Sequence, residues 1–315
     1  RTMTKFDYIK GTAFFRDSFL PFSDANLSIA SSPVLYGLSV YTVFSLNWNK
    51  EESKLYAFRL EDHFQRLISS SKIMDFHSFA EKWDYKKFKD MTMELVKRNG
   101  IREDALVRVS IFADALCAGT KIHGLEHAVS AYIYPMGEIL PRSGINVCVS
   151  TWRRNPDNAI PSRAKVNGGY ANVCLMRNEA IMNGYDDAIA LDLEGNVTEG
   201  TVANLFLVRG GKLITPSANF DILEGITRDS IMKIAKDAGL EIIERTIARS
   251  ELYIADEVFI TGSSARITPI LSIDKRAVGS GKIGQITEEL SRKYEEAQKG
   301  VNGEHGEWRT VCPLT

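Results

Sequence analysis

Aromatic and β-branched residues are frequent throughout residues 1–58, a composition typical of strands. Turn-forming residues interrupt the segment at 24–26 and 47–49, so we expect a sheet there. Two further strand-like runs follow, ALVRVSIFA at 105–113 and AVSAYIYP at 128–135. The first part of the chain is therefore expected to be built around a sheet.

Apolar residues at helical spacing predict two helices in the same part of the chain. In RLEDHFQRLISSSKIM, the apolar residues at 60, 64, 67 and 68 would lie on one face of a helix. A second helix is expected from Asp84 to Arg98, and Asn99-Gly100 would end it.

The segment PMGEILPRSG at 135–144 carries two prolines and two glycines and is the expected linker between a domain at 1–134 and a larger one at 145–315. After it we expect a strand in INVCVST, a helix at 170–183 and a β-meander from DAIALDLEGN to GKLITP. The remaining expected elements are a helix in ITRDSIMKIAKDAG, strands in EVFITG and ITPILSID, and a polar helix at 284–299. Residues 300–315 show no periodicity, and we expect a loose tail there.

Length and charge narrow the class of protein. A chain of 315 residues with 44% hydrophobic and 25% charged residues fits a globular α/β protein of two domains. With a net charge of −1, the chain lacks the excess positive charge that favours binding to nucleic acid or an acidic membrane. The ligand is therefore expected to be small. No apolar run reaches the roughly 18 residues of a membrane span, and no signal peptide is evident. The four scattered cysteines are typical of reduced thiols, which predicts a cytoplasmic protein.

The stretch IPSRAKVNGGYAN, at 160–172, places Lys165 among small residues, before Gly168-Gly169 and a tyrosine. Most lysines are simply exposed cations. Confinement away from water would favour the neutral amine, which can attack a carbonyl group. Lys165 is therefore a candidate catalytic residue.

Three segments are candidate anion sites. EGITRDS puts Gly225 and Thr227 at the start of a predicted helix, where N–H groups and the helix dipole can bind phosphate, unless Thr227 is only an N-cap. TGSSAR, at 261–266, is either such a site or an ordinary turn after a strand. Arg59, where a strand enters a helix, is either a phosphate ligand or an exposed cation beside Glu61 and Asp62.

Glu199, in NVTEGT, lies in a predicted strand. A carboxylate in a half-buried strand is costly unless it has a cationic partner. The alternative is a solvated glutamate.

Two rival motifs are weaker. Ser162 and Lys165 form the S-x-x-K pattern of serine acyl-enzymes, but the S-D-N and K-T-G elements of that chemistry are broken. His123 and His127 are spaced to share a metal on a helix, but Gly124 weakens the helix and the sequence indicates no third ligand. We expect a surface turn there and no metal site.

With these motifs in order, the chain resembles the fold-type IV pyridoxal-phosphate enzymes, and the branched-chain amino acid aminotransferases most closely. The resemblance is carried by STWRRNPDNAIPSRAKVNGGYAN, GYDDAIALDLEGNVTEGTVANLF, EGITRDSIMKIAKDAG and ADEVFITGSSARITPILSID. These motifs span most of 150–275, and FRLEDHFQRL and LYGLSVY extend it more loosely into the first half. The resemblance implies a two-domain α/β fold, pyridoxal 5'-phosphate in the interdomain cleft, and at least a homodimer whose neighbouring subunit helps to close each site.

The resemblance also implies roles for particular residues. Lys165 would form the Schiff base with the cofactor, Glu199 would face the pyridine nitrogen, and Tyr170 would contact the cofactor oxygen. Asn204 would close the T-E-G-x-x-x-N element. The phosphate would be held by Arg59, Ile226, Thr227, Gly262 and Ser263.

Substrate contacts follow from the same resemblance. Residues expected to border the substrate are Tyr36, Tyr41, Arg108, Ser264 and Ala265, with Arg108 accepting the side-chain carboxylate of glutamate. The chain departs from the family pattern at Leu106, at Thr42-Val43, and at Met136 and Ile139.

The expected function is transfer of an amino group between a branched-chain amino acid and 2-oxoglutarate by a ping-pong mechanism. A D-amino acid or (R)-amine transaminase of the same fold is the main alternative. A serine hydrolase using Ser162 and Lys165, and a catalytically silent binding protein, are the others.

Overall fold

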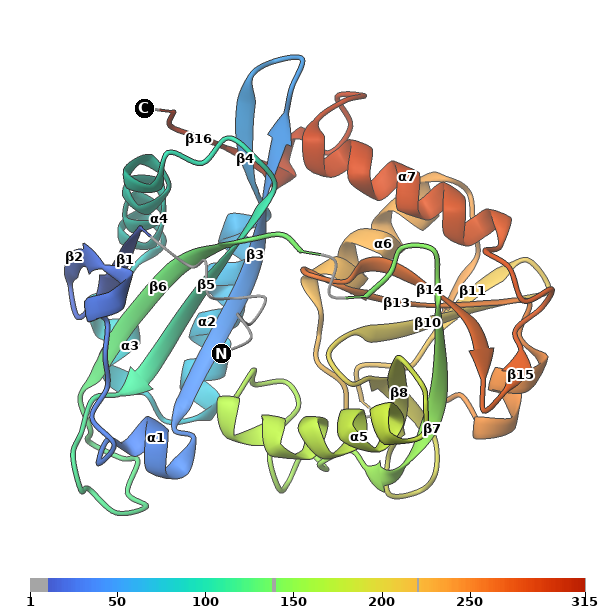
Figure 1. Cartoon of the computed structure of the whole chain (residues 1–315), viewed down its shortest axis with the longest axis horizontal. Helices are drawn as coiled ribbons and strands as arrows, with labels where there is room; N and C mark the ends of the chain where they lie inside the picture. The colour runs from blue at the N-terminus through green and yellow to red at the C-terminus, as the bar shows by residue number, and fades with distance from the viewer. Residues whose placement is uncertain (1–10, 138–139, 220, 315) are drawn as a thin grey trace. The chain divides into compact units, whose positions relative to one another are not determined.

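The computed structural model describes residues 11–137, 140–219 and 221–314 and contains two compact units (Figure 1). Unit 1 consists of the described residues up to Gly137, the short segment Ala164–Gly168 and the chain from Ala297 onward. Unit 2 consists of two parts, the described residues from 140 to 163 and the segment Gly169–Glu296. The first boundary falls in the expected linker. The division differs from the expected one because the lysine segment and the end of the chain belong to unit 1.

Unit 1 is built on a seven-stranded antiparallel sheet in the order β16-β4-β3-β5-β6-β1-β2. Its strands are β1 (Thr12–Phe15), β2 (Ser18–Pro21), β3 (Ser39–Asn49), β4 (Lys54–Phe58), β5 (Ala105–Ala113), β6 (His127–Pro135) and β16 (Arg309–Cys312). Its helices are α1 (Ser32–Tyr36), α2 (Leu60–Ile73), α3 (His77–Lys82) and α4 (Tyr85–Asn99).

The two long helices of unit 1 lie where the apolar spacing predicts them. α2 lies against β3, and α4 lies against β1 and β6. Phe64 of α2 packs on Phe88 of α4, with ring centroids 5.2 Å apart. The carboxylate of Asp84 accepts a hydrogen bond from the Lys87 amide, and Gly100 takes the left-handed conformation at φ 59°, so α4 is capped at both ends.

Unit 2 contains a nine-stranded mixed sheet in the order β12-β11-β10-β13-β14-β7-β8-β9, with β15 beside β14. Because β9 also pairs with β10, six of these strands form a closed ring. The strands are β7 (Ile145–Arg153), β8 (Asp187–Leu191), β9 (Val197–Gly200), β10 (Asn204–Arg209), β11 (Lys212–Thr215), β12 (Ile242–Glu244), β13 (Glu257–Gly262), β14 (Arg266–Ile273) and β15 (Arg276–Ala277). The helices are α5 (Tyr170–Met182), α6 (Ile226–Asp237) and α7 (Gln285–Lys299), which continues into unit 1.

The core of unit 2 is apolar and lies among its strands. Fully buried side chains include Ile189, Leu205, Leu207 and Ile145. α5 packs on β7 and β8 through a smaller cluster that contains Met176. No helix in the described parts of the chain is both long and apolar enough to cross a membrane.

Two expectations for unit 1 are wrong. Residues 47–49 lie inside β3 rather than in a turn, because Asn47 is buried and its side-chain amide donates to the Ser45 hydroxyl at 2.9 Å. The expected loose tail forms the short helix η4 (Gly306–Trp308) and the edge strand β16, which pairs with β4. Trp308 is buried there, so tertiary packing orders a segment that has no periodicity of its own.

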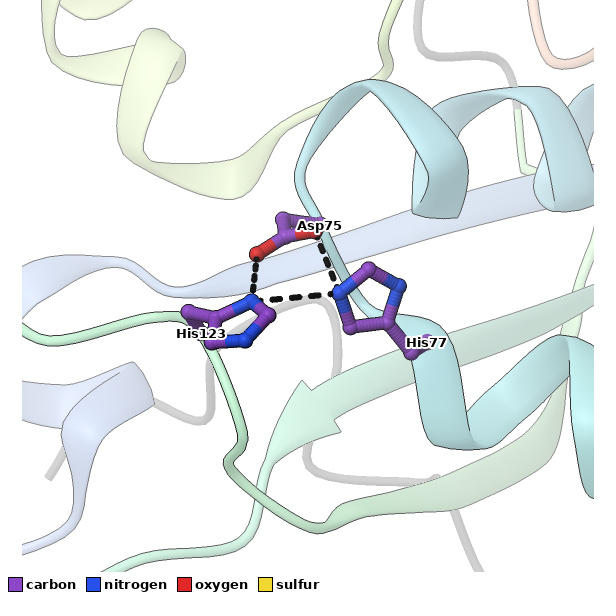
Figure 2. Close-up of side chains that lie close together, drawn as sticks. All are labelled: Asp75, His77 and His123. Atoms are coloured by element: carbon purple, nitrogen blue, oxygen red, sulfur yellow. Dashed lines mark hydrogen bonds and ion pairs between the residues drawn. The ribbon is translucent and has the colours of Figure 1, made fainter.

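The expected surface turn near His123 is present, at His123-Gly124 in the connection between β5 and β6. His123 faces Asp75 and His77 (Figure 2). His127 begins β6 and contacts the Ser78 hydroxyl instead.

Candidate active site

The segment that carries Lys165 runs alongside β3 in unit 1. The Lys165 carbonyl accepts a hydrogen bond from the Tyr41 amide at 3.0 Å, and the Lys165 amide donates to the Ser70 hydroxyl at 3.2 Å. Val166 forms an isolated β-bridge with Val40. The backbone position of the lysine is therefore set by β3 and α2.

Gly168 allows this segment to approach the end of α1 closely. Its amide donates to the Gly37 carbonyl at 3.2 Å. Gly37 has φ +66°, and a Cβ atom added to it would lie 2.6 Å from the Gly168 Cα atom, closer than real Cβ contacts come. This close approach to Gly37 explains why a glycine is required at position 168.

Three of the expected residues meet at the Tyr41 ring. Lys165 Nζ lies 5.0 Å from the ring centroid, and the guanidinium carbon of Arg108 lies 3.7 Å from it. Arg108 also donates to Asn167 Oδ1 at 2.8 Å, and the Asn167 amide donates to the Ser39 hydroxyl. Asn167 thus orients Arg108, a role that we did not assign to it from the sequence.

The pKa of the buried His63 reflects the positive charges that surround it in unit 1. Burial lowers the pKa of His63 well below its ordinary value of 6.5, and the charges of Arg66, Arg59 and Lys165 lower it further. Its Nδ1 atom pairs with the Thr42 hydroxyl at 2.7 Å. The concentration of cations suits an anionic ligand, and it keeps the imidazole neutral.

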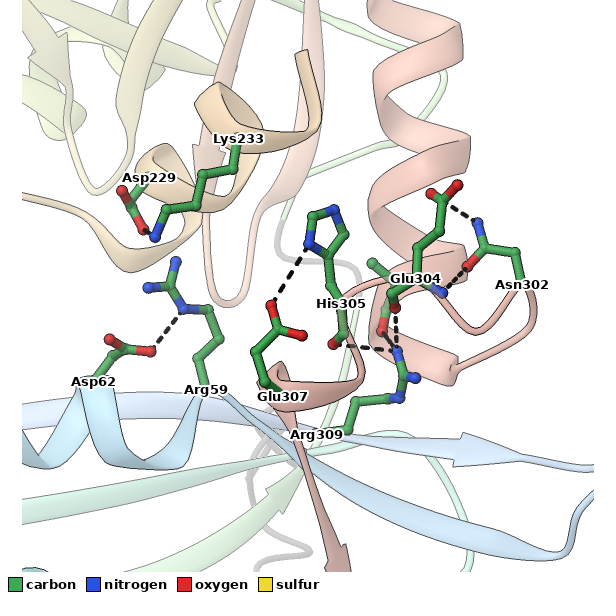
Figure 3. Close-up of polar contacts among 10 residues, drawn as sticks. Arg59, Asp62, Asp229, Lys233, Asn302, Glu304, His305, Glu307 and Arg309 are labelled. Carbon is green, nitrogen blue, oxygen red and sulfur yellow. Dashed lines mark hydrogen bonds and ion pairs between the residues drawn. The ribbon is translucent and has the colours of Figure 1, made fainter. Parts of the chain in front are cut away.

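Arg59 is buried, so it is not the exposed cation of the alternative interpretation. It adopts φ 49° at the start of α2, where its amide donates to the Trp308 carbonyl at 2.6 Å. Its guanidinium Nε donates to Asp62 at 2.7 Å, as Figure 3 shows, and its guanidinium carbon lies 5.2 Å from the Trp308 ring centroid. β16 and η4 therefore help to fix Arg59.

The end of the chain is itself held by backbone acceptors. Arg309 donates to the carbonyl groups of Ala297 and Glu304, each at 2.8 Å (Figure 3). His305 stacks on Trp308 with ring centroids 3.8 Å apart. These contacts order the residues that surround Trp308.

Tyr36, at the end of α1, is 41% exposed.

In unit 2, Glu199 lies in β9 and is buried. Its Oε1 atom lies 2.7 Å from Arg154 Nη2, and its Oε2 atom accepts hydrogen bonds from the Asn204 side-chain amide at 3.0 Å and the Leu223 backbone amide at 3.2 Å. The cationic partner that a buried carboxylate requires is therefore Arg154.

Arg154 was missed as a functional residue. It follows β7 in the dipeptide Arg153-Arg154, and its amide donates to the Leu191 carbonyl of β8 at 2.9 Å. Arg153 is exposed, whereas the side chain of Arg154 is 14% exposed. Two arginines after an apolar strand could have indicated a buried cationic partner for a carboxylate. The sequence does not show which of the two side chains points inward.

Strand register places several motif residues in one row of unit 2. Asn204 of β10 lies opposite Glu199 on one side and Thr261 of β13 on the other. β13 ends at Gly262, and the turn Ser263–Ala265 follows directly. The Thr261 hydroxyl is buried and has no hydrogen-bond partner among the described residues.

The start of α6 adjoins this row. Asn204 donates to the Leu223 carbonyl at 2.8 Å, and a Cβ atom added to Gly225 would lie 2.0 Å from Asn204 Oδ1. Ile226 and Thr227 begin the helix and are buried, with Thr227 Oγ1 3.4 Å from the Tyr294 hydroxyl. The T-E-G-x-x-x-N and E-G-I-T motifs are therefore brought together, as the sequence predicts. Tyr170 is the half-buried first residue of α5.

Comparison with known proteins identifies the family. The model of the amino-transferase class IV family matches residues 39–273. A protein of Aquifex aeolicus named probable branched-chain-amino-acid aminotransferase is 40% identical over 95% of this chain and 96% of its own.

Two solved structures are similar over nearly the whole chain. A branched-chain aminotransferase from Thermoproteus uzoniensis with norvaline has a TM-score of 0.91 and 34% identity, covering 96% of this chain and 99% of its own. The T.th. branched-chain amino acid aminotransferase with N-(5'-phosphopyridoxyl)-L-glutamate has a TM-score of 0.88 and 33% identity, covering 96% and 98%. The chain belongs to the class IV aminotransferases, the fold-type IV enzymes that use pyridoxal 5'-phosphate.

Proposed function

We propose that the chain is a branched-chain amino acid aminotransferase that uses 2-oxoglutarate as acceptor in a ping-pong reaction. The name of the Aquifex aeolicus relative supports the donor, and the glutamate adduct named for the T.th. enzyme supports the acceptor. These names favour this proposal over a D-amino acid or (R)-amine transaminase. A hydrolase using Ser162 has no support from the family.

The described residues fit pyridoxal phosphate. Three features suit a phosphorylated ligand. They are the Thr261 hydroxyl, which has no hydrogen-bond partner among the described residues, Gly225 at the N-terminus of α6, and the cations near His63. When bound, this cofactor acts as an electron sink for the substrate Cα. We propose that the phosphate is held by Arg59, Ile226, Thr227, Gly262 and Ser263.

The observation that carries the proposal is the buried Glu199 with its three donors. Arg154 stabilises the negative charge of Glu199, and Asn204 orients its carboxylate. Such a fixed negative charge suits a protonated ring nitrogen. Lys165 would hold the cofactor through Nζ. Once the substrate amine has displaced it, the freed Nζ amine would take the proton from the substrate Cα and pass it to the cofactor. Tyr170 would contact the oxygen substituent of the cofactor ring.

Substrate recognition is proposed for Tyr36, Tyr41, Arg108, Ser264 and Ala265. Arg108 offers a guanidinium group oriented by Asn167 and stacked on Tyr41, which suits a carboxylate.

Most of the positions that depart from the family pattern lie in unit 1. Leu106 is fully buried, and the Thr42 hydroxyl is occupied by His63. Met136 is at the end of the described part of unit 1. Ile139 lies outside the described residues.

Assembly and compartment are further parts of the proposal. We propose a cytoplasmic homodimer or larger homo-oligomer. Trp152, Ile181 and Met182 are exposed apolar side chains of unit 2, which favours an interface. Sedimentation of the holoenzyme as a monomer would contradict this part.

The reaction is tested with an amino-donor panel of L-leucine, D-leucine, L-valine and both 1-phenylethylamine enantiomers, against 2-oxoglutarate and pyruvate. We expect L-leucine or L-valine with 2-oxoglutarate to react fastest, and borohydride to attach the cofactor to Lys165. Preference for D-leucine or an amine would contradict the substrate. Transamination by Lys165→Ala near the unmutated rate would contradict the site.

A further inference from the structure

Three metal-ligating side chains converge on the surface of unit 1. Figure 2 shows Asp75, His77 and His123 at the corners of a triangle, with each carboxylate oxygen of Asp75 facing one imidazole. Asp75 Oδ1 lies 2.5 Å from His77 Nε2, and Asp75 Oδ2 lies 2.9 Å from His123 Nδ1. The two ring nitrogens are 3.3 Å apart.

These donors come from two segments that are far apart in sequence. Asp75 and His77 lie in the connection from α2 to α3, and His123 lies in the connection from β5 to β6. Asp75 has φ +61°, a left-handed conformation that an aspartate adopts at a cost, and Phe76 beside it is buried. The backbone thus aims the carboxylate outward while Phe76 anchors the segment.

Neighbouring contacts hold the two segments in register. The Ser78 hydroxyl accepts a hydrogen bond from the His127 amide at 3.0 Å and pairs with His127 Nδ1 at 2.8 Å. Lys82 forms an ion pair with Glu126. The donor atoms are therefore positioned by contacts that do not depend on a bound ion.

The spacing of the two imidazole nitrogens matches a tetrahedral metal site, whereas the Asp75 oxygens lie at hydrogen-bond distance from them, 2.5 and 2.9 Å, and would move apart from the nitrogens around an ion. With metal–nitrogen bonds of about 2.0–2.1 Å, two ligands of a tetrahedron lie roughly 3.3–3.4 Å apart. The observed distance between the imidazole nitrogens is 3.3 Å, and all three donor atoms lie within 4.8 Å of one another. A single cation would satisfy lone pairs on two nitrogens and one oxygen at once.

We propose that Asp75, His77 and His123 bind a divalent transition-metal ion, with water in the remaining positions. Two imidazoles and one carboxylate suit Zn²⁺ among such ions. Both histidines are exposed and Asp75 is half-buried, so an ion can enter from solvent and keep bound water. The bound ion would link the α2–α3 connection to the β5–β6 connection and stabilise unit 1.

The experiment uses the holoenzyme, freed of metal with a chelator that is then removed, and titrates zinc chloride into it by calorimetry. We expect saturable binding of one ion per chain. Asp75→Asn and His123→Asn should each weaken it at least about tenfold, because loss of a ligand costs no less than loss of a supporting contact. Two controls lie outside the cluster: Asp90→Asn removes an exposed carboxylate of α4, and His305→Asn removes another imidazole.

A second measurement tests the ligands directly. Cobalt chloride should give the visible spectrum of a tetrahedral nitrogen and oxygen site, without a thiolate band. Zinc should raise the melting temperature of the wild type but not of His123→Asn. Absence of saturable binding by the wild type, or equal affinity in wild type, Asp75→Asn and His123→Asn, would overturn the proposal.

Discussion

Arg154 Nη2 lies 2.7 Å from Glu199 Oε1, and the two side chains are 14% and 6% exposed. An ion pair this deeply buried is costly to break, because removing one partner leaves an uncompensated charge. Glu199 also accepts two further hydrogen bonds, which fix its orientation. A negative charge is thus held in one place.

Glu199→Gln is expected to lower kcat by about 100- to 1000-fold, the usual effect of removing one charge-stabilising group. Turnover per bound cofactor is the measurement. Glu251→Gln is the matched control, because Glu251 is also a buried carboxylate of unit 2, paired with Arg209 and Arg245. It should lose stability and retain kcat. Similar kcat losses in both variants would contradict the role of Glu199.

Gly37→Ala is expected to displace the lysine segment, because its Cβ atom would meet Gly168 Cα at 2.6 Å. An ångström of displacement costs roughly 100-fold in turnover. Gly100→Ala is the control, since Gly100 also follows a helix at φ +59° but has open space around it. Both variants carry backbone strain of about 1–2 kcal/mol. Equal activity of the two would show that the close approach at Gly168 is unimportant.

Arg108→Ala is expected to raise KM for 2-oxoglutarate more than KM for the 2-oxo acid of leucine. Loss of a charge-assisted hydrogen bond to the distal carboxylate is worth roughly 10- to 100-fold. Steady-state kinetics with each acceptor measure the ratio. Arg98→Ala, on the exposed side of α4, should change neither value. Parallel losses for the two acceptors would remove Arg108 from substrate recognition.

Thiol reactivity should separate the cysteines. Burial raises the pKa of Cys148 to about 11 and of Cys312 to about 12, whereas Cys117 is exposed. Because the thiolate is the reactive form, Cys148 and Cys312 should resist a thiol reagent until the protein unfolds. Cys117 and Cys174 are exposed and should react in the folded protein, and replacing both by serine should remove that reaction. Rapid labelling of Cys312 would mean that β16 detaches readily.

Stability should fall as pH falls below about 6.5. Burial lowers the pKa of His127 from 6.5 to about 4, and the buried His63 shifts in the same direction. Between these values the unfolded chain binds protons that the folded chain excludes, so protonation favours unfolding. Urea midpoints between about pH 7.5 and 5 measure the slope. His127→Gln should flatten it, and an unchanged slope would show that His127 titrates normally.

The sequence predicts most of the regular elements, because local patterns determine them. The apolar stripe at Leu60, Phe64 and Leu67 indicated α2, and Asp84 with Gly100 indicated the ends of α4. The order of the motifs was also sufficient to indicate the family.

Long-range contacts were not predictable from local patterns. Three contacts join segments that are distant in sequence. Val166 pairs with Val40, Arg154 rather than Arg153 pairs with Glu199, and His77 lies close to His123. The turn signal at Asn47 was misleading for a different reason, because its buried side-chain amide donates two residues back, to the Ser45 hydroxyl, inside β3.

The pairing of β16 with β4 has a consequence for biosynthesis. Residues 309–312 complete a sheet whose other strands end at Pro135, and Trp308 supplies the acceptor for the Arg59 amide. A nascent chain cannot finish this sheet until Cys312 has been translated and has left the ribosome. Until then β4 is an open edge, so premature release of the polypeptide should favour aggregation.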